Sequence, residues 1–195
     1  RASLALGGDR RRVTVLFADV VAFTAFAEQA PPEKVVAFLN ELFTVLTEVV
    51  FRHGGMVDKF IGDCVMAVWG AGSVALDDEG QRRAALETAE DMHRFVEASA
   101  PEWRERYGID VSLGIGVHTG DALLGNLGSE TRMEYTAIGD VVNVAARLES
   151  LARGAQTLVT AEVTAGMSGD FTFSPLGPHA LRGKRAPVDI FEVMS

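Results

Sequence analysis

Two apolar segments joined by only two residues constrain the fold of this chain more than any other feature. Met56–Ile61 and Cys64–Trp69 both contain β-branched and aromatic residues, and only Gly62 and Asp63 separate them. A two-residue link that contains glycine between such segments is typical of a tight β-hairpin. The sequence therefore predicts two neighbouring antiparallel strands, with Asp63 in the turn.

The rest of the chain alternates between strand and helix patterns. Val13 to Ala18 is an apolar, β-branched segment that predicts a buried strand. Apolar residues at helical spacing follow Pro31-Pro32, and His53-Gly54-Gly55 ends that helix. We expect further helices at about 76–99, 140–152 and 161–167, and strands at 109–118, 123–127, 133–138, 156–160, 171–176 and 187–193.

Two of these boundaries depend on residues that usually interrupt regular structure. Pro101 is expected to end the second long helix, since proline removes a helical hydrogen bond. Thr119-Gly120-Asp121 is expected to form a turn after the strand that starts near Ile109.

This order of elements predicts an α/β (α+β) sandwich. Its core is expected to be a ferredoxin-like βαββαβ unit, with helices packed on a mostly antiparallel sheet and with C-terminal additions. We expect residues 1–12 to be a linker or the end of an upstream regulatory segment, and residues 13–195 to form one domain.

Composition excludes several classes of protein. The net charge is −9, which argues against a general nucleic-acid binder, because such binders need clustered positive charge. No apolar segment reaches the roughly 18 residues that suggest a membrane-spanning helix. Cys64 is the only cysteine, which excludes an intramolecular disulfide and fits a reducing compartment.

Asp19 and Asp63 are the strongest candidates for functional residues. Asp19 follows the predicted buried strand, and Asp63 lies in the hairpin turn. Each aspartate alone has an ordinary structural explanation, as a helix cap or as a turn residue. Together, two carboxylates at strand ends suit a hard cation such as Mg²⁺, and the turn from Val20 to Thr24 offers backbone N–H groups to phosphate. The combination indicates an enzyme that acts on a nucleoside triphosphate.

A third motif runs from Tyr135 to Glu149. On its predicted helix, Asn143 and Arg147 are four residues apart and share one face. They could be a solvent-facing pair, or they could orient a sugar and meet the charge that develops on a phosphate.

These motifs resemble those of the catalytic domain of class III nucleotidyl cyclases, the adenylyl and guanylyl cyclases. The resemblance covers about residues 10–194 and rests on Phe17-Ala18-Asp19-Val20-Val21-Ala22-Phe23-Thr24, Lys59-Phe60-Ile61-Gly62-Asp63 and the Tyr135–Glu149 segment. It implies that residues 13–195 are a cyclase catalytic domain of the bacterial or soluble-type adenylyl cyclase subgroup, which converts ATP to 3′,5′-cyclic AMP and pyrophosphate.

The resemblance also implies a metal site. Asp19 and Asp63 match the two metal-binding aspartates of the family, and the backbone carbonyl of Val20 matches a further ligand. The resemblance implies two Mg²⁺ or Mn²⁺ ions per active site. One ion would lower the pKa of the ribose 3′-hydroxyl, and the other would hold the triphosphate. The backbone amides around Phe23 and Thr24 match the groups that bind the β- and γ-phosphates.

Lys59 and Thr136 match the two positions that select the base. Lysine at the first position donates to N1 of adenine, whereas guanylyl cyclases usually have glutamate there, so Lys59 favours ATP over GTP. The Thr136 hydroxyl can accept a hydrogen bond from the exocyclic amine of adenine. Some relatives with this threonine respond to bicarbonate, which makes bicarbonate an expected effector.

Five further residues receive roles from the resemblance. Asn143 matches the amide that orients the ribose, and Arg147 matches the arginine that meets charge growing at the α-phosphate. Arg182 and Lys184 in the C-terminal region, together with Arg132, are further candidates for binding the triphosphate.

The resemblance finally implies a head-to-tail homodimer. In the family, one subunit gives the metal aspartates of an active site and the other gives the base-selecting, ribose-orienting and transition-state residues. This chain contains both sets, so we expect two equivalent sites per dimer and an upstream regulatory domain that rotates the subunits. We expect a cytoplasmic location, as a separate protein or as a domain of a larger one, with no nucleic-acid or membrane contact.

Three alternatives to an adenylyl cyclase stay open at this point. A guanylyl cyclase would use the same chemistry on another base, and Lys59 argues against it. A catalytically silent cyclase-like module for dimerisation or nucleotide sensing would typically have lost one of the matched residues. A diguanylate cyclase or polymerase-palm relative would have a different hairpin turn from Ile61-Gly62-Asp63-Cys64.

Overall fold

A computed structural model describes residues 8–72 and 74–194. One sheet has the strand order β2-β3-β1-β4-β6-β8-β7, and β5 pairs with β4 outside this path. Its strands are β1 Gly8–Val20, β2 Met56–Ile61, β3 Cys64–Trp69, β4 Leu113–Ser129, β5 Arg132–Ile138, β6 Gln156–Thr160, β7 Thr172–His179 and β8 Val188–Met194. The helices are α1 Phe23–Gln29, α2 Pro32–Arg52, α3 Asp78–Tyr107, α4 Asp140–Leu151 and α5 Ala161–Thr164.

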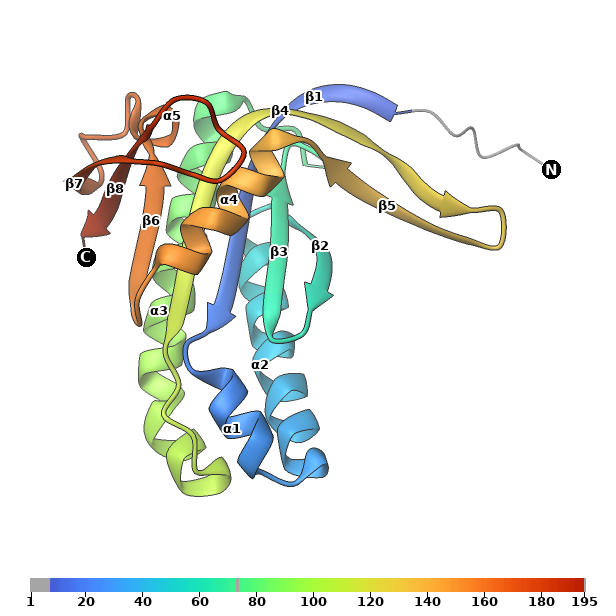
Figure 1. The fold of residues 1–195 in the computed structure, drawn as a ribbon, viewed down its shortest axis with the longest axis vertical. Helices are drawn as coiled ribbons and strands as arrows, with labels where there is room; N and C mark the ends of the chain where they lie inside the picture. The colour runs from blue at the N-terminus through green and yellow to red at the C-terminus, as the bar shows by residue number, and fades with distance from the viewer. Residues whose placement is uncertain (1–7, 73, 195) are drawn as a thin grey trace.

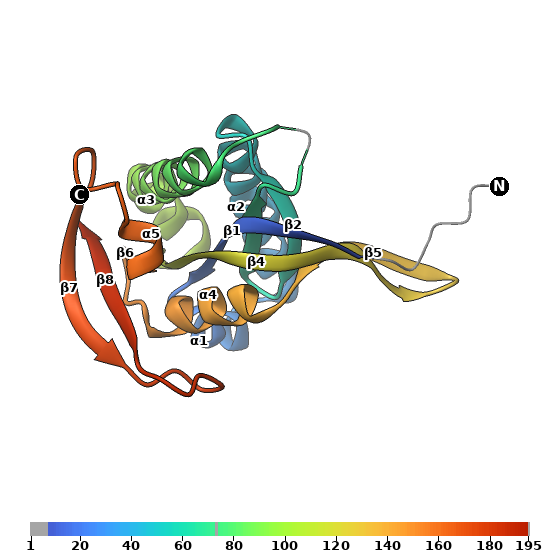
Figure 2. The same ribbon diagram turned by 90° about the horizontal axis from the view of Figure 1, so that it is seen from above.

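The helices cover both faces of the sheet. Figures 1 and 2 show α2 and α3 on one side and α4 on the other. Strand β1 lies between these layers: Leu16 and Ala18 belong to the core under α2 and α3, whereas Val15 and Phe17 pack with Val141 of α4. A strand buried on both faces must be apolar on both, which is why Val13 to Ala18 shows no polar alternation. The predicted sandwich with a mostly antiparallel sheet is confirmed.

The predicted hairpin forms as expected, but β1 starts earlier than its apolar pattern suggested. Its first residue is Gly8, and residues 8–12 pair in antiparallel register with residues 121–125 of β4. Residues 8–12 are therefore part of the sheet, not a linker before it. Residues 1–7, the rest of the predicted linker, lie outside the described residues.

The predicted turn at Thr119-Gly120-Asp121 is wrong. Strand β4 runs through these residues without interruption because β1 supplies a partner for each, with Val13 opposite Gly120 and Arg12 opposite Asp121. The far half of β4 then pairs with β5, and this hairpin extends beyond the body of the domain (Figure 1).

Pro101 does not end α3, which continues to Tyr107. A proline inside a helix costs about 3 kcal/mol, so the following turns need a compensating contribution. Burial of Trp103 and Tyr107, whose rings both contact Phe38 edge-on, supplies it. The helix ends instead at Gly108, which has the left-handed conformation, with φ 70°, that suits a glycine.

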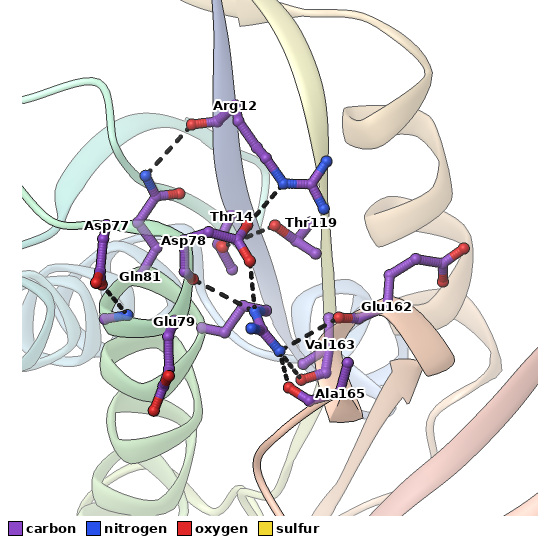
Figure 3. Close-up of polar contacts among 12 residues, drawn as sticks. Arg12, Thr14, Asp77, Asp78, Glu79, Gln81, Thr119, Glu162, Val163 and Ala165 are labelled. Atoms are coloured by element: carbon purple, nitrogen blue, oxygen red, sulfur yellow. Dashed lines mark hydrogen bonds and ion pairs between the residues drawn. The ribbon is translucent and has the colours of Figure 1, made fainter.

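A polar cluster joins the start of α3 to β1 and α5 (Figure 3). Arg12 Nε lies 2.7 Å from Asp78, and Gln81 donates to the Arg12 carbonyl. The buried guanidinium of Arg82 pairs with Asp78 at 3.1 Å and donates to the Val163 carbonyl at 3.2 Å. Because the last carbonyls of a helix have no partner within it, Arg82 fastens α5 to α3.

Two largely buried histidines that contact β6 make stability sensitive to acid. His93 and His118 bond to the hydroxyls of Thr157 and Thr160 on β6, and burial lowers the pKa of each imidazole to about 4. Since the unfolded chain binds these protons near pH 6.5, it takes up more protons than the folded chain below that value. We expect the free energy of unfolding to fall as pH decreases from about 6.5 to about 4.

Urea unfolding at several pH values measures this effect. His118→Gln should flatten the slope between about pH 6.5 and 4. Equal slopes in this variant and in the wild-type protein would contradict the link between buried histidines and acid sensitivity.

Candidate active site

A small polar cavity lies where β1 meets α1 and the β2–β3 turn. Its volume is about 270 Å³. The chain turns from β1 into α1 at Ala22, whose left-handed conformation, with φ 60°, costs a non-glycine residue roughly 1–2 kcal/mol. The lining residues are Asp19, Val20, Val21, Ala22, Phe23, Thr24, Asp63, Glu149, Ser150 and Ala152. All five residues predicted for metal and phosphate binding on the first two motifs are among them.

The two aspartates are held close together by the backbone. The Val20 amide, next to Asp19, donates to Asp63 Oδ2 at 3.1 Å and so ties the hairpin turn to the end of β1. Burial, and then the charge of Asp19, raise the pKa of the Asp63 carboxyl. Like charges that face each other in a partly buried space are costly without a cation.

Glu149 brings a third carboxyl group to this cavity. It is 8 % exposed and lies on the last turn of α4. Burial first, and then the neighbouring Asp19 and Asp63 carboxylates, raise the pKa of Glu149 to about 9. Burial and the two neighbouring carboxylates together therefore favour the protonated form of Glu149.

The donor set fits a divalent cation that is shared with a substrate. Carboxylate and carbonyl oxygens are the ligands that Mg²⁺ and Mn²⁺ prefer. Within residues 8–72 and 74–194, no three His, Cys, Asp or Glu side chains are arranged to hold a metal ion by themselves. Two aspartates that leave the remaining positions to water and phosphate match the usual way in which proteins bind Mg²⁺ with nucleotides.

A second cluster joins the two predicted base-selecting residues. Thr136 on β5 bonds to both oxygens of Asp58 on β2, at 2.9 and 3.1 Å. Lys59 Nζ lies 3.7 Å from Asp58 and 3.4 Å from Glu134. The structure thus places Lys59 and Thr136 around one buried carboxylate, although 77 positions separate them in the chain.

Helix α4 carries the predicted ribose and transition-state residues. Val144, Ala145 and Leu148 are buried against the sheet, which leaves Asn143 exposed and Arg147 half-buried. Gly139 precedes the helix with φ 146°, a conformation open to glycine. The cavity that contains the three carboxyl groups, called the carboxylate cavity below, is not lined by Asn143 or Arg147. It is not lined by Lys59 or Thr136 either.

The three further phosphate candidates lie in two separate parts of the domain. Arg132 is exposed at the tip of the β4–β5 hairpin. Arg182 is exposed in the segment between β7 and β8, and Lys184 in the same segment pairs with Asp140 at the start of α4. None of the three lines the cavity.

Two residues at these clusters escaped the sequence reasoning. Glu149 closes the third motif, and a carboxylate beside core positions of a helix could have drawn attention to it. Asp58 precedes Lys59, and a charged residue inside an apolar strand was the available signal. The pattern of residues does not show which strand such a side chain meets.

Comparison with known proteins agrees with this arrangement. Residues 8–194 match the model of the adenylate and guanylate cyclase catalytic domain. The chain belongs to this family. The cyclase domain is 38% identical over 193 residues to adenylate cyclase 1 of Rhizobium meliloti, covering 95% of this chain and 28% of the relative. It is 32% identical over 192 residues to an adenylate cyclase of Anabaena cylindrica, covering 94% of this chain and 37% of the relative.

Solved structures of both specificities are similar to the cyclase domain. The adenylyl cyclase CyaB from P. aeruginosa has a TM-score of 0.92 at 31% identity, with 97% of each chain covered. The guanylyl cyclase Cya2 has a TM-score of 0.85 at 32% identity, with 96% of this chain and 94% of that chain covered. Overall similarity therefore does not separate ATP from GTP, and the choice depends on side chains at the site.

Members of this family use divalent metals, and their catalytic domains act as dimers. The present chain spans about a third of the length of the two curated relatives. None of the helices in the described part of the chain is long and apolar enough to span a membrane.

Proposed function

We propose that this domain converts ATP to 3′,5′-cyclic AMP and pyrophosphate, in active sites formed between two copies of the chain. The observation that carries the proposal is the pairing of a lysine donor, Lys59, with a threonine hydroxyl, Thr136, around Asp58. Adenine presents an acceptor at N1 and a donor at its exocyclic amine. Guanine presents the opposite pattern on that edge, so this pair favours ATP.

The carboxylate cavity is suited to the triphosphate end of the substrate. Asp19, Asp63 and the Val20 carbonyl would hold divalent cations, and we propose two per site. When bound, these ions lower the pKa of the ribose 3′-hydroxyl and neutralise phosphate charge. The backbone amides around Phe23 and Thr24, at the start of α1, would hold the β- and γ-phosphates.

The remaining steps depend on α4. Asn143 would hold the ribose so that its 3′-oxygen faces the α-phosphorus, which raises the rate by orientation alone. Arg147 would donate to the α-phosphate oxygens as charge grows on them. The 3′-hydroxyl gives its proton to water, and its oxygen bonds to the α-phosphorus. The bond from the α-phosphorus to the oxygen that bridges to the β-phosphate breaks, and pyrophosphate leaves.

A second copy of the chain is needed in this proposal. Lys59, Thr136, Asn143 and Arg147 all lie outside the carboxylate cavity of their own chain. A head-to-tail homodimer would bring two groups of residues from one chain to the carboxylate cavity of the other. One group is Asn143 and Arg147 on α4, and the other is Lys59 and Thr136 around Asp58. Arg132, Arg182 and Lys184 are the candidates for closing such a site over the triphosphate.

Initial rates with ATP and with GTP, with the cyclic product identified, test the proposal. We expect cyclic AMP as the main product in Mg²⁺ or Mn²⁺. Cyclic GMP as the main product would favour the guanylyl cyclase alternative, and the absence of either product in Mn²⁺ would favour the silent module.

Two regulatory features extend the proposal. The curated relatives are much longer than this chain, so we propose that a regulatory domain acts on the cyclase domain in a longer protein, in the cytoplasm where ATP is available. We also propose bicarbonate as an effector because of Thr136. Equal rates in bicarbonate and in chloride at constant pH would remove that suggestion.

A further inference from the structure

Asp58 occupies an unusual place in the β2–β3 hairpin. The pairing of the two strands passes from Val57 opposite Ala67 directly to Lys59 opposite Met66, so Asp58 is the extra residue of a β-bulge. A bulge re-aims a side chain away from the regular alternation of a strand. Here the re-aimed carboxylate reaches β5, and its side chain is fully buried.

The hydrogen bonds of Asp58 show that its neighbours donate to it. The Ala137 amide can only donate, and it bonds to Asp58 Oδ2 at 2.9 Å. The Thr136 hydroxyl lies 2.9 Å from Oδ1 and 3.1 Å from Oδ2, and a carboxylate only accepts. A buried charge needs such partners, and the nearby Lys59 ammonium balances it. The single hydroxyl hydrogen of Thr136 is therefore directed to Asp58.

Directing that hydrogen inward changes what Thr136 offers to a ligand. A hydroxyl has one donor and two acceptor positions, and its donor is already used. Thr136 is only 2 % exposed, so bulk water does not compete for the hydrogen. The competing acceptor, the Ala137 carbonyl, is farther away at 3.4 Å. What is left at the Thr136 oxygen is acceptor capacity only.

We propose that Asp58 is a positioning residue that sets base selectivity by keeping Thr136 a hydrogen-bond acceptor. The inference rests on the proposed function, because it takes Lys59 and Thr136 as the residues that meet the base. An acceptor at this position accepts a hydrogen bond from the 6-amino group of adenine. It repels the 6-oxo group of guanine or hypoxanthine, which has no proton to give.

Asp58→Asn removes the nearer acceptor of the Thr136 hydroxyl hydrogen and puts a donor in its place. The Ala137 amide holds the new side-chain oxygen in place, so the asparagine NH₂ group must face Thr136 and donate to it. The hydroxyl hydrogen then keeps only the more distant side-chain acceptor, at 3.1 Å, and can turn toward the base to donate to a 6-oxo group. We expect the ratio of kcat/KM for ATP to that for ITP, and likewise to that for GTP, to fall about tenfold.

A fourth substrate and a second substitution separate positioning from general damage. Purine riboside triphosphate lacks the 6-amino group, and we expect wild-type enzyme to use it about tenfold less well than ATP. In Asp58→Asn that difference should disappear. In a Thr136→Val background, Asp58→Asn should leave all these ratios unchanged, since no hydroxyl remains to reorient.

Controls keep the test independent of folding and of the proposed function. Asp110→Asn removes the same charge from a side chain that is 81% exposed and should keep wild-type ratios. Asp58→Ala, measured in parallel, also frees the Thr136 hydroxyl and should shift the ratios in the same direction. It replaces Asp58→Asn in the test if that variant folds poorly. Thermal melts report folding for each variant.

Two outcomes would overturn the inference. One is a folded Asp58 variant with wild-type ratios between the four substrates. The other is an equal fall of those ratios in the Thr136→Val background, which would mean that Asp58 acts through the general structure of the hairpin. Failure of the wild-type protein to form cyclic AMP would instead count against the proposed function.

Discussion

A one-to-one mixture of the Asp19→Ala and Arg147→Ala variants is expected to form cyclic AMP, although each variant alone is nearly inactive. Loss of a transition-state donor such as Arg147 typically lowers the rate by about 10²–10³, and loss of a metal-binding aspartate should cost at least as much. In a mixed dimer, one site receives Asp19 and Arg147 from the two chains that still carry them. Random exchange makes about half of the dimers mixed, with one intact site of two, so about a quarter of wild-type activity should return.

A matched mixture provides the control for this experiment. Asn143→Ala and Arg147→Ala both alter α4, whose exposed face would enter the site of the partner chain. A mixed dimer of these two variants has one defect in each site, so no recovery is expected. The proposed two-chain site would be wrong if Asp19→Ala and Arg147→Ala failed to complement while mixed dimers were shown to form by native mass spectrometry.

Asp63→Asn is expected to abolish activity and yet to stabilise the metal-free domain. Burial and the neighbouring Asp19 raise the pKa of the Asp63 carboxyl, which means that its ionised form destabilises the folded state at neutral pH. Asparagine removes that charge but keeps an oxygen to accept from the Val20 amide. The rate should fall about 10³-fold or more, and the melting temperature in EDTA should rise.

The dependence on pH makes this second prediction specific. A carboxyl with a raised pKa contributes stability at low pH and loses that contribution as pH rises through its folded pKa. The advantage of Asp63→Asn should therefore be present at neutral pH and vanish in acid. Asp110→Asn, at an exposed position, should change neither rate nor melting temperature. A lower melting temperature for Asp63→Asn at neutral pH would contradict the electrostatic account of the cavity.

Local patterns predicted the elements that position the cavity. The β2–β3 hairpin follows from Gly62 and Asp63 between two apolar segments, and the burial of β1 on both faces follows from an apolar segment without alternation. The elements that failed depend on distant partners. Gly120 stays in a strand because β1 lies beside it, and Pro101 stays in a helix because the ring of Trp103 is buried beyond it.

The same distinction applies to the candidate site. Asp19, Asp63, Asn143 and Arg147 stand in motifs that a sequence displays directly. The contact between Asp58 and Thr136 depends instead on a one-residue bulge and on the meeting of β2 with β5. Nothing in the local sequence specifies that geometry, because it arises from strand pairing across 78 positions.

The rate of cyclic AMP formation per chain, measured over a wide range of protein concentration with ATP and Mn²⁺, tests the central claim most directly. A site shared by two chains predicts that this specific activity rises with concentration and levels off once dimers predominate, in step with the dimer fraction from analytical ultracentrifugation. A specific activity that stays constant down to concentrations at which only monomers remain would contradict the shared site.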